Sequence, residues 1–188
     1  CTLTARYGPA VYCVLSKSPT QEFGGFIVDG VLYDGIHTYS DWWAVGTYHD
    51  IEATFSDTSG GERYLFDYWS DGGAIAHEVG PIETGINLTA HYQPQYKLTL
   101  IKNPLHSEGF FRIDSEAYFD SSRVEVWLAP GSAPMVTASD IDVVSGNERY
   151  LWNNWSDGGA MSHIIEPMAG SVELIANYDH QYRFIIAK

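Results

Sequence analysis

Apolar and polar residues alternate one by one along several short stretches of the chain. Every second residue is apolar in 88–92 (LTAHY), and 123–129 (RVEVWLA) shows the same period. A two-residue period puts one face toward a core and the other toward solvent, as in a β-strand. Turn signals such as Asp29-Gly30 and Pro130-Gly131 recur roughly every 8–12 residues, and no window shows a capped helical period. The pattern predicts an all-β fold, a sandwich or barrel.

A long internal repeat organises the chain. Residues 62–97 align without a gap with residues 148–183, and 17 of these 36 positions are identical. The hexapeptide WSDGGA occurs whole in both copies, at 69–74 and 155–160. Copies separated by 86 residues predict two tandem Ig-like β-sandwich modules of about seven strands each.

Partial copies flank the two modules. LTARY at 3–7 matches LTAHY at 88–92 and LIANY at 174–178, and a strand-like segment follows each of them. The predicted organisation is therefore an N-terminal strand, a first module, a second module and an extra C-terminal strand. Their bounds are 1–9, 10–93, 94–179 and 180–188.

The WSDGGA box has a structural interpretation. Its Trp is large enough to fill the space between two sheets, and Asp-Gly-Gly supplies a turn whose positive φ suits Gly. The residues assigned to this core and turn are Trp69, Asp71, Gly72, Trp155, Asp157 and Gly158. Calcium at Asp71 and Asp157 is the alternative, although one carboxylate beside two glycines offers few of the six to eight oxygens that calcium needs. His77 and His163 are repeat equivalents, which favours structural hydrogen bonds over catalysis.

The order RYxFxxWSDGGAxxH, then LTAxY, then QYxLT resembles extracellular β-repeats of bacteria and archaea. These repeats are related to divergent internalin-type B-repeats and other bacterial Ig-like modules, and the resemblance covers about two-thirds of the chain. It implies a spacer, stalk, surface-layer or adhesive module without catalytic residues.

The charge balance excludes several partner classes. The chain has 24 acidic and 10 basic residues, a net charge of −14, which argues against nucleic acid and anionic membranes. No apolar run approaches the roughly 18–20 residues of a membrane helix, so we expect no membrane insertion. GxSxG, HxxxH and phosphate-binding Gly-rich motifs are absent. We expect no enzymatic activity and, apart from the calcium alternative, no cofactor.

The first residues suggest an exported protein. The chain starts at Cys rather than Met and carries no basic-plus-apolar leader, which fits a mature extracellular or cell-surface protein, or an excised fragment. Cys1 and Cys13 flank a turn, and an intrachain disulfide between them is the favoured interpretation. An intersubunit bond and lipidation of Cys1 are the alternatives. Asn87 and Asn154 begin glycosylation sequons and are predicted to face outward.

The C-terminal strand is apolar on both faces. Tyr182, Phe184 and Ile186 share one face, and Ile185 lies on the other. An unpaired apolar strand is an aggregation hazard that proteins normally avoid. We therefore expect this strand to add to a neighbouring copy near its N-terminal strand, which would give a head-to-tail, pilus-like filament. The predicted subunit interface consists of Thr2, Leu3, Thr4, Ala5, Tyr182, Phe184, Ile185 and Ile186.

Two further functions compete with the filament. The chain could be a stalk or spacer piece of a larger surface protein. It could also be a carbohydrate-binding or adhesive module in which Trp42, Trp43 or Trp127 stacks on sugar rings. Trp127 lies at an outward-facing position of its predicted strand, whereas Trp42 and Trp43 are adjacent and must point to opposite faces.

Overall fold

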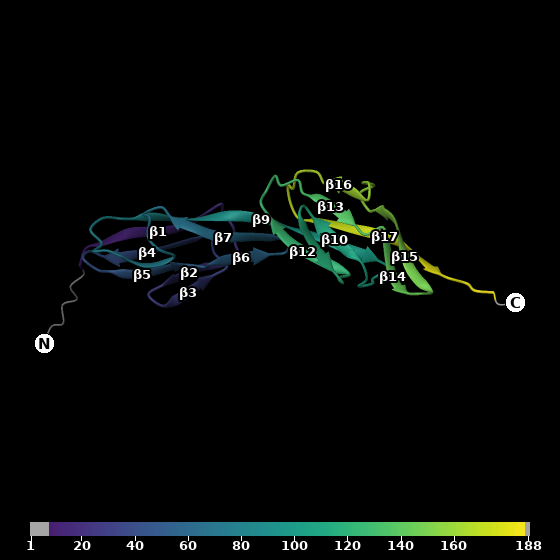
Figure 1. The fold of residues 1–188 in the computed structure, drawn as a ribbon. Coiled ribbons are helices and arrows are strands. Elements are labelled where there is room, and N and C mark those ends of the chain that lie inside the picture. The colour runs from purple at the N-terminus through teal and green to yellow at the C-terminus, as the bar shows by residue number, and fades with distance from the viewer. Residues whose placement is uncertain (1–7, 187–188) are drawn as a thin grey trace. The chain divides into compact units, whose positions relative to one another are not determined.

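The computed structural model describes residues 8–186 (Figure 1). These residues form strands joined by turns and loops, with no helix among them, so the all-β prediction is confirmed. Consequently, this part of the chain contains no helix that could cross a membrane. The chain divides into two compact units, Cys1–Pro94 (unit 1) and Gln95–Lys188 (unit 2).

Unit 1 is a sandwich of two sheets. The first has the order β4-β1-β9-β7-β6, and the second has the order β3-β2-β5-β8. β1 pairs antiparallel with β4 and parallel with β9. The strands are β1 (Ala10–Ser18), β2 (Gly25–Val28), β3 (Val31–Asp34), β4 (Thr38–Ala44), β5 (His49–Ala53), β6 (Ser56–Ser59), β7 (Glu62–Trp69), β8 (Ala76–Val79) and the first half of β9 (Asn87–Asn103).

Unit 2 repeats this arrangement. Its sheets have the orders β12-β9-β17-β15-β14 and β11-β10-β13-β16. The second half of β9 takes the place of β1, pairing antiparallel with β12 and parallel with β17. The other strands are β10 (Phe110–Ile113), β11 (Glu116–Phe119), β12 (Arg123–Leu128), β13 (Met135–Ala138), β14 (Ile141–Ser145), β15 (Glu148–Trp155), β16 (Ser162–Ile164) and β17 (Val172–Tyr182).

One extra residue in unit 2 changes the spacing of the repeat. Asp57 and Asp142 are 85 residues apart, whereas Glu62 and Glu148 are 86 apart. The pairing of β14 with β15 shifts register between Val143 and Ser145, while β6 pairs with β7 without a shift. A β-bulge absorbs the additional residue, and the strands that follow keep their facing.

An indole fills the core of each unit. Trp69 and Trp155 are both buried, and they pack against the rings of Phe26 and Phe111 respectively. The Trp69 Nε1–H donates to Ile75 O at 3.0 Å, and the equivalent bond in unit 2 is 3.1 Å. A buried indole therefore keeps a partner for its polar N–H while its rings join the two sheets.

The C-terminal strand begins inside unit 2. The structure pairs Tyr182 with Glu148 and His180 with Tyr150, so β17 remains in its own sheet as far as residue 182. The prediction that a separate strand begins at residue 180 is wrong for residues 180–182, because these residues continue the pairing of β17 with β15. The predicted N-terminal strand, residues 1–9, lies outside the described residues except for Gly8 and Pro9, which precede β1.

Candidate functional site

The WSDGGA turn has the same geometry in both units. Gly72 and Gly158 each have φ of +80°, a conformation that favours Gly. Asp71 Oδ1 accepts the Gly73 N–H at 3.0 Å, and the bond from Gly159 to Asp157 has the same length. The box is thus a tight turn closed by its own carboxylate.

A histidine six residues later completes each turn. His77 Nε2 lies 3.0 Å from Asp71 Oδ2, and its Nδ1 lies 2.7 Å from Ala74 O. Burial raises the pKa of Asp71, but the Gly73 N–H and the His77 ring outweigh it and hold this pKa below its usual range. Asp157 and His163 repeat the arrangement. A Cβ on Gly73 would come within 2.5 Å of His77 Nε2, so glycine is needed for packing as well.

The described residues provide no set of ligands for calcium at the two turns. Both oxygens of Asp71 already accept bonds from the turn, and the same holds for Asp157. Across residues 8–186, no group of three or more His, Cys, Asp or Glu side chains is placed to hold a metal.

Each unit buries a lysine–aspartate pair that sequence analysis missed. Lys17 Nζ lies 2.7 Å from Asp57 Oδ2, and Lys102 Nζ lies 2.9 Å from Asp142 Oδ2. All four side chains are fully buried. The lysines lie at the ends of β1 and the equivalent part of β9, and the aspartates lie on β6 and β14. The signal in the sequence was the shared spacing, because both lysine and aspartate recur after 85 residues.

Other polar groups satisfy the remaining atoms of each pair. Lys17 Nζ donates to Phe23 O at 2.8 Å, and Thr54 Oγ1 donates to Asp57 Oδ1. In unit 2 His106 Nε2 lies 2.8 Å from Asp142 Oδ2, where unit 1 has Gln21 beside Asp57. A buried charge is tolerated only when it is paired and hydrogen-bonded in this way. With no exposed surface, the pair can fix the position of the strand but cannot meet a substrate.

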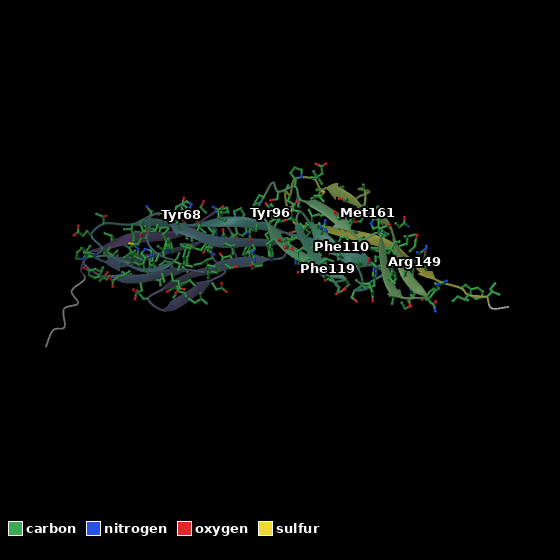
Figure 2. All side chains as sticks on the ribbon, viewed as in Figure 1. Tyr68, Tyr96, Phe110, Phe119, Arg149 and Met161 are labelled. Carbon is green, nitrogen blue, oxygen red and sulfur yellow. The ribbon has the colours of Figure 1, made fainter. Side chains whose placement is uncertain are left out.

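The chain leaves unit 2 as an exposed apolar tail. The Arg183 N–H donates to Asn147 O at 2.8 Å, and Phe184–Ile186, in no strand, extend away from the unit (Figure 1). Phe184 and Ile186 are 87% and 82% exposed, and Ile185 and Tyr182 are also exposed. Figure 2 shows Arg149 near the start of this tail, where its Nε donates to Gln181 Oε1 at 2.9 Å.

More exposed apolar surface lies next to the tail. Ile141, Val143 and Val144 on the edge strand β14 are exposed. On β6, Ser56 and Thr58 stand in place of Ile141 and Val143, and the bulge residue Val144 has no counterpart. A pocket of about 460 Å³ adjoins them, lined partly by Val143, Tyr182 and Arg183. Unit 2 therefore carries an apolar surface at the base of the tail that unit 1 lacks at the matching strand.

The residues predicted at the N-terminus are only partly described. Cys13 is buried in the core of unit 1, and it forms no disulfide with any residue in the range 8–186. Cys1 lies outside the described residues, as do Thr2, Leu3, Thr4 and Ala5. A disulfide would require Cys1 to reach the core, and this bond and the N-terminal part of the interface stay predictions.

The predicted surface residues have contrasting environments. Asn87 and Asn154 are exposed, and Asn154 Oδ1 accepts a bond from Asn177 at 2.8 Å; their glycosylation stays a prediction. Trp42 is 65% exposed and Trp43 is 3% exposed, as their opposite facing requires. Lys97 Nζ lies 5.9 Å from the centre of the Trp127 ring, so a cation partly covers that indole.

Comparison with known proteins assigns no family. No protein-family description matches the sequence, and no curated protein matches it. Among solved structures, the shaft pilin SpaA of Lactobacillus rhamnosus GG is similar over 95% of this chain and 100% of that chain, with 8% identity and a TM-score of 0.29.

Two streptococcal proteins give comparable values. An ancillary pilin is similar over 90% of this chain and 62% of its own, with 11% identity and a TM-score of 0.32. Tandem SHIRT domains 3–4 of a cell-surface protein reach 9% identity and a TM-score of 0.26 over 92% of this chain and 99% of theirs. Likenesses of this size assign no function to this chain.

Proposed function

We propose that this chain is a non-enzymatic structural protein of the cell surface. In this proposal it is a subunit of an extracellular filament that assembles head to tail when the C-terminal strand of one copy adds to a neighbouring copy. The resemblance to extracellular bacterial and archaeal repeats supports the cell-surface location and the non-enzymatic role, whereas the assembly is argued from the tail. The observation that carries the proposal is the exposure of Phe184 and Ile186.

Strand addition suits the tail physically. Burying one large apolar side chain stabilises by roughly 1.5–3 kcal/mol, and Phe184, Ile185 and Ile186 are all available for burial. A partner strand would also satisfy the backbone groups of residues 184–186, which form no strand within their own unit. The contact is heterologous, because the tail and its acceptor are different surfaces, and such contacts extend into filaments when they do not close.

Introducing charged residues on the apolar face of the tail tests the proposal. We expect the full chain to form filaments in electron micrographs, and the variant with Phe184→Asp and Ile186→Asp to remain single chains by light scattering. Leu105→Asp, at another exposed apolar residue of unit 2, is the matched control and should assemble normally. Single chains of the unaltered protein, or filaments of the double variant, would contradict the proposal.

A stalk or spacer is the nearest alternative, since tandem sandwich units serve that role without self-assembly. The mass of the natural protein separates the two. A polypeptide much longer than 188 residues, with no filaments formed by the isolated chain, would favour the spacer.

Sugar binding is supported by one surface of unit 1. The exposed rings of Trp42 and Tyr12 lie 5.4 Å apart on neighbouring strands, and aromatic faces of this kind can stack on sugar rings. A glycan array that gives signals for the unaltered chain and none for Trp42→Ala would establish this function. An array without signals would remove it.

A further inference from the structure

The last eight residues repeat the first strand of each unit. Residues 181–188 (QYRFIIAK) align without a gap with 95–102 (QYKLTLIK) and with 10–17 (AVYCVLSK). All three segments end in lysine, and in the two units that lysine is the buried partner of Asp57 or Asp142. The tail therefore has the sequence of a first strand.

The alignment matches each tail residue to a position in β1 and in the second half of β9, where the burial of the side chain is known. Phe184 corresponds to Cys13 and Leu98, and Ile186 corresponds to Leu15 and Leu100. These four core positions are at most 1% exposed, whereas Phe184 and Ile186 are 87% and 82% exposed. In a single copy, the tail side chains that align with core positions are therefore exposed to solvent.

The structure contains two first-strand positions, and that of unit 1 is the easier one to vacate. The first strand of unit 2 is continuous with the closing strand of unit 1, since both belong to β9 (Asn87–Asn103). β1, in contrast, begins after Gly8 and Pro9, which lie in no strand. Over its whole length β1 is the more apolar segment, but the tail offers a larger side chain at one core position, because Phe184 stands where β1 has Cys13.

We propose that the tail of one copy replaces β1 in unit 1 of the next copy. Lys188 then takes the place of Lys17 at Asp57, and the inserted strand runs parallel to β9 and antiparallel to β4. This inference rests on the proposed filament and adds the identity of the acceptor. Asp57 fixes the register, because a slip by one residue would move the ammonium to the other face and leave a buried carboxylate without its partner.

A disulfide trap tests the position and register directly. Val14 pairs with Ser40 across β1 and β4, so residue 185 of the inserted tail would lie opposite Ser40 of the acceptor. The trap carries Ile185→Cys and Ser40→Cys, with Cys1→Ser and Cys13→Ala in the background. The matched control replaces Ser40→Cys by Glu125→Cys, the equivalent position in unit 2, where Glu125 pairs with Thr99.

We expect oxidation of the trap to give a ladder of covalent multimers on non-reducing gels, at least tenfold stronger than in the control. Adding Lys188→Met to the trap should weaken the ladder at least tenfold. Phe184→Leu introduces the residue that unit 2 has at this position. This variant should leave the ladder as strong or stronger, because Leu is smaller than Phe and fits more easily where Cys13 now lies.

The outcomes separate the acceptor from the filament itself. Filaments in electron micrographs without a ladder, a ladder equally strong in the control, crosslinked single chains only, or no effect of Lys188→Met would overturn the inference while the proposed function stood. The absence of filaments from the unaltered chain would overturn both.

Discussion

One glycine in each unit lies against the carboxylate of the buried ion pair. A Cβ on Gly109, which has φ of +78°, would lie 1.7 Å from Asp142 Oδ1. Gly131 has nearly the same φ, +77°, and open space around its added Cβ. The two positions therefore separate the effect of backbone conformation from the effect of moving the carboxylate.

We expect Gly109→Ala to lower the free energy of unfolding of unit 2 by about 3–5 kcal/mol, because the displaced Asp142 no longer pairs with Lys102. Gly131→Ala should cost only about 1 kcal/mol, from the positive φ alone. Urea titrations followed by tryptophan fluorescence would measure both. Equal losses would mean that the carboxylate moves aside without cost.

The turn aspartates give the protein an acid-sensitive contribution to stability. The folded-state pKa values of Asp71 and Asp157 lie below the ordinary value of 3.8. Their contribution is therefore complete above that value and is lost as the pH falls through the lower, folded pKa.

We expect replacement of both aspartates by Asn to cost about 1 kcal/mol per turn at pH 7, since the charged acceptor for His77 or His163 is lost. The variant should also lose less stability than the unaltered protein when the pH falls below about 4. Unfolding curves at several pH values test this. Parallel loss of stability in the two proteins would show that these carboxylates do not contribute.

At the scale of elements, the hydrophobic period and the repeat predicted the fold class and the WSDGGA turn because both depend on local patterns. The buried Lys17–Asp57 pair could not be predicted from the period, because its residues are 40 apart and meet only when β1 and β6 come together. The end of β17 was also missed. Residues 180–182 look like the start of a new strand in the repeat, but their ladder to β15 depends on the length of β15.

The bulge in β14 should be dispensable. Unit 1 closes the matching hairpin without it, so deleting Val144 gives unit 2 the spacing of unit 1 and leaves the facing of β15 unchanged. We expect this deletion to change the free energy of unfolding by less than about 1 kcal/mol.

A deletion within β15 provides the control. Removing Leu151 shifts the following residues by one, so that Trp155 would face away from the core, and unit 2 should not fold. Circular dichroism and urea titration distinguish these outcomes. A Val144 deletion that unfolds unit 2 would show that the bulge is required for its packing.

At the scale of the whole molecule, net charge opposes the proposed assembly. Each copy carries −14 at pH 7, and joining copies brings like charges together. The contact itself is expected to be apolar, with one buried ion pair between Lys188 and Asp57. Salt screens exposed charges strongly and buried pairs weakly, and the screening length falls from about 30 Å at 0.01 M to about 10 Å at 0.1 M.

We therefore expect filaments to lengthen, and the fraction of single chains to fall, when sodium chloride is raised from roughly 0.01 M to roughly 0.15 M. Light scattering and electron microscopy at fixed protein concentration measure this. An interface held by exposed ion pairs predicts the opposite, because screening would weaken it. Filaments that shorten with salt would thus rule out an apolar strand as the main contact, whereas filaments that lengthen would agree with an apolar contact between copies.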